Sequence, residues 1–181
     1  VALTAGLAGS DNVAVGAAGT VTVNNIGGTT RAAVTGTDIN KELDNSTVDD
    51  VAVKAQDVTT SESHVGSLAV GIGADGGAGV SAASDTLLLS RKTAAELSGT
   101  DTAKKTVNGR NVAVTADQQS TVITNADGVA GAGGVYGAGA VAATAAATKL
   151  DGSVTATMKN INSTNKGLEI SAKHDHKTTL V

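Results

Sequence analysis

Proline, cysteine, tryptophan and phenylalanine are absent from this 181-residue chain, and tyrosine and methionine each occur once. Without cysteine the chain forms no disulfide, which is compatible with an exported protein that does without them. Without aromatic side chains it lacks the large apolar groups that dominate ordinary globular cores. The core must therefore consist of small and β-branched side chains, each of which buries less apolar area than phenylalanine. Such a core suits closely spaced backbones and favours stacked strands over a two-layer domain.

Charge of either sign is also scarce, with 13 Lys and Arg against 17 Asp and Glu and a net charge of −4. This balance lacks the basic patch of a nucleic-acid-binding protein and the basic cluster that holds a protein to an anionic membrane surface. Disorder is disfavoured too, because 40% of the residues are hydrophobic and the net charge is small. The chain begins at Val1 with no signal peptide, and we interpret it as a segment of a longer chain.

A Val-x-Val-x-Ala phrase recurs along the chain, beginning at Val51, Val112 and Leu168, which are 61 and 56 residues apart. A Thr-rich phrase recurs in the same order. It is centred on Val34, Leu97 and Val154. Repetition at a fixed period is the mark of repeat architectures. We predict one β-solenoid segment, 1–181, made of three imperfect units of about 60 residues. Their bounds are roughly 1–64, 65–124 and 125–181.

Strands should be short in this interpretation. Three strands of about five residues with short turns make a coil of about twenty residues, so each unit would hold three coils and the chain eight or nine. Apolar residues alternate with polar ones, as in strands with one buried face. The alternating sets are Val13/Val15, Val21/Val23, Val51/Val53/Ala55, Leu68/Val70/Ile72, Leu87/Leu89, Val112/Val114/Ala116 and Leu168/Ile170/Ala172.

Turn signals separate these sets. They are Gly27-Gly28, Asp75-Gly76, Asn108-Gly109, Asp127-Gly128, Asp151-Gly152 and Lys166-Gly167. Charge gathers in 38–50 and 94–108, and we expect both segments to bulge from the wall. Asn-Gly and Asp-Gly also begin hairpins, so an antiparallel sandwich is the structural alternative. Because sandwiches usually carry core aromatics and proline, the solenoid is favoured.

The run VAVGAAGTVTVNNI at 13–26, followed by TRAAV at 30–34, resembles the repeats of filamentous-haemagglutinin-like adhesins and leukotoxin-type bacterial exoproteins. These proteins are exported by the two-partner route. The second and third units depart from the pattern, with Leu87-Leu88-Leu89 and an Ala/Thr run at 142–148 in place of the Val-x-Val-Asn phrase. The resemblance implies a right-handed parallel β-helix, passage through an outer-membrane transporter, a place at the bacterial cell surface, and adhesion.

His174 and His176 are the most suggestive pair of metal ligands, because residues i and i+2 lie on the same side of a strand. Lys173 and Lys177 flank them and would repel a cation, and no third ligand is evident. Counting from Ala172 places both imidazoles inward, so we expect a corner after Ala172 that turns them outward. We predict no metal site.

Other chemical motifs are weak. The segment Gly71 to Asp75 contains part of a calcium-binding nonapeptide, but it occurs once and does not repeat at nine residues. Neither a Gly-x-Ser-x-Gly elbow nor a phosphate loop ending in Gly-Lys-Ser/Thr is present. We therefore predict no catalytic residue, no cofactor and no enzymatic activity.

Two functions remain open. The first is a structural and adhesive shaft that binds glycans or proteins of a host or neighbouring cell and projects a distal tip. Exposed coil ends would also allow end-to-end self-association. The second is the scaffold of a membrane-active toxin, suggested by the uncharged stretch 129–147. Its Ala and Gly residues insert poorly into lipid, so a tightly packed solenoid wall is favoured.

Overall fold

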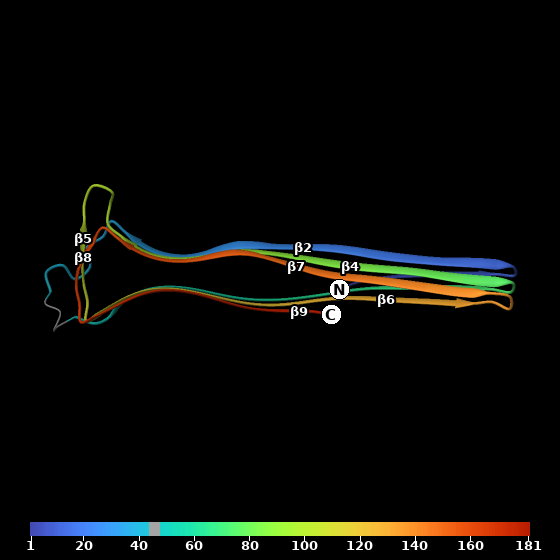
Figure 1. Ribbon diagram of the computed structural model, residues 1–181. Helices are drawn as coiled ribbons and strands as arrows, with labels where there is room; N and C mark the ends of the chain where they lie inside the picture. Colours follow the sequence, from blue (N-terminus) through green and yellow to red (C-terminus); the bar gives the residue numbers. More distant parts are fainter. Residues whose placement is uncertain (44–47) are drawn as a thin grey trace.

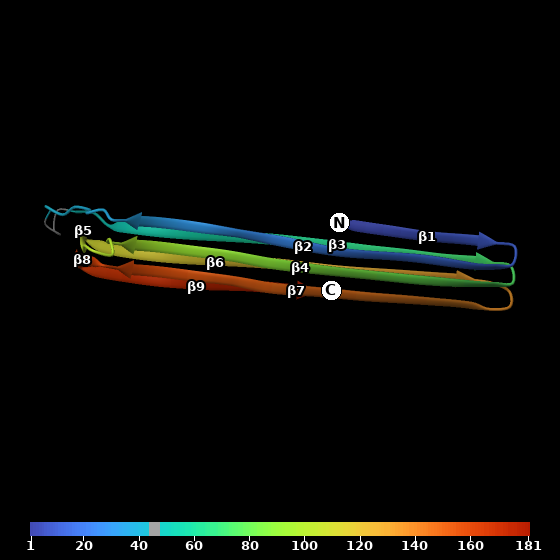
Figure 2. The same ribbon diagram turned by 90° about the horizontal axis from the view of Figure 1, so that it is seen from above.

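The computed structural model describes residues 1–43 and 48–181 and shows an elongated all-β solenoid of parallel strands (Figures 1 and 2). The predicted fold class is confirmed. The strands are β1 (Ala2–Ser10), β2 (Val13–Thr35), β3 (Val51–Gly73), β4 (Gly76–Ser98), β5 (Lys105–Asn108), β6 (Asn111–Gly133), β7 (Ala138–Lys159), β8 (Ile161–Thr164) and β9 (Gly167–Leu180).

The coils are flat, with two long walls and one short one. Wall A has the strand order β1-β3-β6-β9, wall B the order β2-β4-β7, and wall C pairs β5 with β8. Tight turns such as Gly73 to Gly76 join walls A and B at one end, which we call the tip. Wall C closes the opposite end, the base, and Ile39 extends it by a bridge to Val107. Figure 1 shows the tip on the right and the base on the left.

Each 60-residue unit is a single coil. In wall A, Val51 pairs with Val112 and Val112 with Leu168, as the spacing of the first phrase predicted. The prediction of three coils per unit is wrong, because β2, β3, β4 and β6 are each 23 residues long. Gly27-Gly28, Asp127-Gly128 and Asp151-Gly152 lie inside strands rather than at turns.

The second phrase is aligned only in part. Val34 pairs with Leu97 as expected, but Leu97 pairs with Met158, and Val154 lies beside Thr93. All the same, Val154 is partly buried and packs against the core that contains Leu97. A shift of four residues keeps a side chain on the same face of a strand, and for this reason Val154 still points inward.

The apolar core lies in the base half. Val53, Leu97, Val107, Val112 and Val114 pack together there and are almost completely buried. Ile170 continues the ladder of Val53 and Val114, but it is 48% exposed because β9 is an edge strand of wall A. A core of aliphatic side chains therefore holds walls A, B and C together at this end.

The tip half is built in the opposite sense, with small residues inside and large ones outside. A Cβ atom on Gly16, Gly71 or Gly79 would collide with backbone carbonyl oxygens of the facing wall. Across this narrow interior the hydroxyls of Ser67 and Ser81 lie 2.6 Å apart and share a hydrogen bond. Between the tip turns and this serine pair, the walls are too close for inward side chains much larger than alanine or serine.

Three of the predicted buried sets are consequently on the outer face. They are Val13/Val15, Val21/Val23 and Leu68/Val70/Ile72, with Val15 62% and Ile72 60% exposed. Leu87/Leu89 and Val112/Val114/Ala116 are buried as expected. Alternation defines two faces of a strand, and here the wall spacing decides which of them is inside.

The two expected bulges belong to the base. In 94–108, Ala94 to Ser98 completes β4 and Lys105 to Asn108 forms β5, so this prediction is wrong for most of the segment. In 38–50, residues 44–47 lie outside the described residues. The Asn40 side-chain amide donates to the Asn108 carbonyl, and the Asn108 amide donates to the Asn40 carbonyl. Polar residues in this region pair across coils and extend wall C.

Candidate interaction surface

The outer side of wall B near the tip is an apolar sheet surface, which we call the apolar face. It comprises the outward residues from Val13 to Val23 in β2 and their register partners in β4 and β7. The members of the apolar face are Val13, Val15, Ala17, Gly19, Val21, Val23, Ala78, Val80, Ala82, Ser84, Thr86, Gly139, Val141, Ala143, Ala145 and Ala147. None of these side chains carries a charge, and Ser84 and Thr86 are the polar ones.

A shallow depression crosses the middle of the apolar face. Gly19, Ala82 and Ala143 are register partners in successive coils and form its floor, with Val21 at its edge. The depression follows from stacking, because in-register small residues leave a groove perpendicular to the strands. Charges begin only toward the base, for example at Lys149.

Wall A carries a different surface toward the base, which we call the polar quartet. Gln119 pairs with Asp175 and Thr121 pairs with Lys177, and the four side chains line a shallow depression across β6 and β9. An amide, a hydroxyl, a carboxylate and an ammonium group are thus within one small area. These are the groups that hydrogen-bond to sugar hydroxyls and to peptide groups.

We did not predict the quartet from the sequence, although a signal was present. The 56-residue offset that aligns Val112 with Leu168 also places Asp175 beside Gln119. Neighbouring outward residues of a solenoid can be recognised from the sequence only when equivalent positions of successive repeats are compared.

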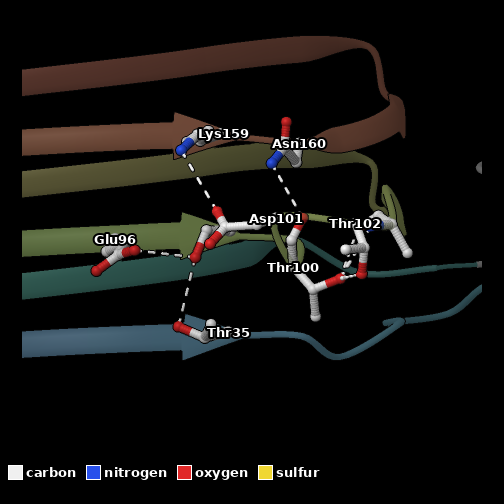
Figure 3. Close-up of polar contacts among 9 residues, drawn as sticks. Thr35, Glu96, Thr100, Asp101, Thr102, Lys159 and Asn160 are labelled. Atoms are coloured by element: carbon white, nitrogen blue, oxygen red, sulfur yellow. Dashed lines mark hydrogen bonds and ion pairs between the residues drawn. The ribbon is translucent and has the colours of Figure 1, made fainter.

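Charged side chains pair at the corner where wall B meets the base, and Figure 3 shows one ion pair there, between Lys159 and Asp101. Arg31 and Glu96 form an ion pair with their side chains 2.5 Å apart, and the Ser98 hydroxyl donates to Glu96 at 2.9 Å. Hydrogen bonds from Arg31 and then from Ser98 hold the pKa of Glu96 below its ordinary value. Beyond the corner, the Asn160 amide donates to the carbonyl of Thr100. Because these groups satisfy one another, we assign them to fastening the coils rather than to binding.

The corner predicted after Ala172 is absent, and this expectation is wrong. Strand β9 continues to Leu180, with His174 beside Gln118 and His176 beside Ser120, both of which are buried. The two imidazoles therefore lie on the interior side of wall A, with ring centroids 5.5 Å apart, and stay exposed because β9 is an edge strand. Within 1–43 and 48–181, no group of three His, Cys, Asp or Glu side chains could hold a metal ion.

Two other sequence motifs, the segment from Gly71 to Asp75 and the uncharged stretch 129–147, form parts of the strands and turns at the tip. Gly71 and Gly73 lie at the end of β3, where the facing wall leaves no room for a Cβ atom, and Asp75 is in the tip turn. The uncharged stretch 129–147 forms the end of β6, a tip turn and the first half of β7. In the described part of the chain no helix is long and apolar enough to cross a membrane.

No protein-family model matches the chain, and neither a curated protein nor a solved structure matches it. The fold and its surfaces define a parallel β-solenoid whose outer surface is aliphatic near the tip and polar near the base.

Proposed function

We propose that the chain is a structural and adhesive shaft segment of a large bacterial surface protein, exported by a two-partner transporter as in the filamentous-haemagglutinin-like adhesins that it resembles. The observation that carries this proposal is the polar quartet on a rigid, stacked wall. Gln119, Thr121, Asp175 and Lys177 present varied hydrogen-bonding groups in a shallow depression, which suits glycan or protein surfaces of another cell.

Such a surface would bind firmly only when many copies of it act together. A shallow polar depression buries little of any one ligand, so a single contact is weak. Many copies on one cell convert weak contacts into firm attachment through avidity. Stacked coils supply the stiffness that holds the surface away from the cell.

Exposed aliphatic side chains at the tip favour a second candidate, the scaffold of a membrane-active exoprotein. Leu3, Leu7 and Ile72 on wall A are exposed there in addition to the apolar face. Release of dye from lipid vesicles by the isolated chain would support this candidate, and the shaft proposal expects none.

The test of adhesion compares beads that carry many copies with single chains. We expect beads to bind epithelial cells or a glycan array with an apparent dissociation constant roughly 10²–10⁴-fold lower than the single chain, because of avidity. The double variant Gln119→Ala/Asp175→Ala should lose this binding, whereas Ile72→Ser at the tip should keep it. Beads that bind no better than bare beads, or equal binding by the quartet variant, would refute the proposal.

A further inference from the structure

The exterior of the tip half is more hydrophobic than its interior. On wall B, Val15, Val21 and Val141 are each more than 60% exposed, while the inward positions beside them are Ala, Gly, Ser and Thr. Contiguous exposed apolar patches above a few hundred Å² mark interaction sites in soluble proteins. Most valines of this half therefore lie on an outer surface, and Val65 is an exception that is buried between the walls.

The size of the apolar face can be estimated from strand geometry. At about 3.3 Å per residue and about 4.8 Å between strands, it covers about 36 by 14 Å, or on the order of 500 Å². Two such faces in contact would bury about 1,000 Å², the lower limit for a specific protein interface. The face is therefore large enough for a weak, specific pair.

From this we infer that the apolar face pairs with the apolar face of a second copy of this chain. A flat aliphatic sheet surface fits another flat aliphatic sheet surface, as in β-sandwiches. The axis of two-fold symmetry runs along the depression, so that Gly19, Ala82 and Ala143 each meet the same residue of the second copy. This pairing is lateral and distinct from stacking at the coil ends.

Side-chain sizes on either side of the depression are complementary in this arrangement. Residues of one flank oppose residues of the other flank in the same coil. Next to the depression the opposed pairs are Ala17 with Val21, Val80 with Ser84, and Val141 with Ala145, and farther out Val15 opposes Val23. Beside the depression a valine faces a smaller residue in every coil, which allows close packing there without large voids. The two coil axes run in the same direction, and the two bases point away from each other.

A lipid bilayer is a poorer occupant of the same surface. In this chain β2 and β7 are the edge strands of wall B, and their free backbone groups would be unsatisfied in hydrocarbon. The apolar face also lacks the Trp, Tyr and Lys anchors found on interfacial protein surfaces. A protein surface leaves these edges in water and covers only the aliphatic side chains.

Sedimentation velocity over a range of concentrations tests the pairing. The chain should form a dimer with a dissociation constant in the micromolar range, given the small interface. Val141→Lys should raise this constant at least tenfold, because it buries a charge in the pair. Thr155→Lys on the same strand and Ile72→Lys on wall A are controls that should leave it unchanged, and equal thermal midpoints verify folding.

The absence of cysteine permits a second, geometric readout. A single cysteine in Ala143→Cys should be cross-linked between copies by a short bis-maleimide. The same residue in Thr155→Cys should not, since the two positions would lie roughly 80 Å apart in the pair. A chain that stays monomeric up to its solubility limit overturns the inference. So does a dimer that Ile72→Lys disrupts, or Val141-dependent binding to phosphatidylcholine vesicles without dimers. Adhesion through the polar quartet would survive each of these outcomes.

Discussion

Gly79→Val should destabilise the protein by about 3 kcal/mol or more, the upper range for overpacking a filled interior. A Cβ at Gly79 would meet the backbone carbonyl oxygens of Gly131 and Ala69. Neither can move without separating wall A from wall B, because both belong to strands that are hydrogen-bonded along their length. Urea unfolding followed by far-ultraviolet circular dichroism measures the effect.

Gly139→Val is the matched control, since a Cβ there would have no atom within 4 Å. It makes the same change on the outer face of wall B and should be neutral or slightly stabilising, because β-branched residues favour strands. Similar unfolding midpoints for the two variants would mean that the walls are not in close contact at the tip.

The fold class and the repeat length could be predicted because each follows from a short sequence pattern. Alternation with period two shows strands, and the recurrence of the phrase at Val51 and Val112 gives the register of wall A directly. Neither observation requires knowing where the chain turns. A solenoid needs only that successive repeats stack, and the spacing of a repeated phrase measures this.

Coil size could not be predicted in the same way. Gly27-Gly28 and Asp151-Gly152 have the composition of turns, yet they lie within 22- and 23-residue strands. Gly28 leaves room for the Arg91 guanidinium of the next coil, with which a Cβ at this position would collide. A glycine required by a neighbour in space resembles a glycine required by a turn when only the sequence is read.

The apolar face was mispredicted for a related reason. Alternation at Val13 and Val15 shows that one face differs from the other, and burial of the larger side chains was the natural assumption. The residues between and after them, Ala14 and Gly16, are the ones buried between the walls. A strand whose alternate positions are all Gly, Ala or Ser therefore predicts a close wall and an exposed aliphatic face.

Asp57→Ala should cost about 3 kcal/mol, at the lower end of the range for breaking a buried ion pair. Asp57 is buried in the interior and accepts hydrogen bonds from Arg91 at 2.5 and 3.1 Å, from Thr30 at 2.9 Å and from Thr59 at 2.9 Å. The variant leaves the Arg91 guanidinium between the walls without its carboxylate. Arg91 is partly exposed, so water can hydrate its guanidinium when the carboxylate is missing. We therefore expect a cost at the lower end of the range for a buried ion pair.

The pH dependence of the unfolding free energy tests whether the ionised Asp57 carboxylate is the stabilising group. Burial opposes ionisation of Asp57, but hydrogen bonds from Arg91, Thr30 and Thr59 outweigh it and hold its pKa below the ordinary value of 3.8. A lowered folded-state pKa means that the stabilisation is complete above about pH 4 and is lost as the pH falls through the folded value. The difference in unfolding free energy between wild type and Asp57→Asn should therefore shrink below that pH.

A double variant separates the ion pair from simple packing. Asp57→Leu/Arg91→Met replaces both charges with apolar side chains and should recover most of the stability lost by Asp57→Ala, because no buried charge is left unpaired. Asp175→Ala, which removes an exposed carboxylate from the outer face of wall A, should change the unfolding free energy by less than about 0.5 kcal/mol. If Asp57→Ala cost no more than Asp175→Ala, the ion pair would contribute nothing to holding wall A against wall B. The close approach of the walls would then rest on the glycine and alanine contacts of the tip and the aliphatic core of the base.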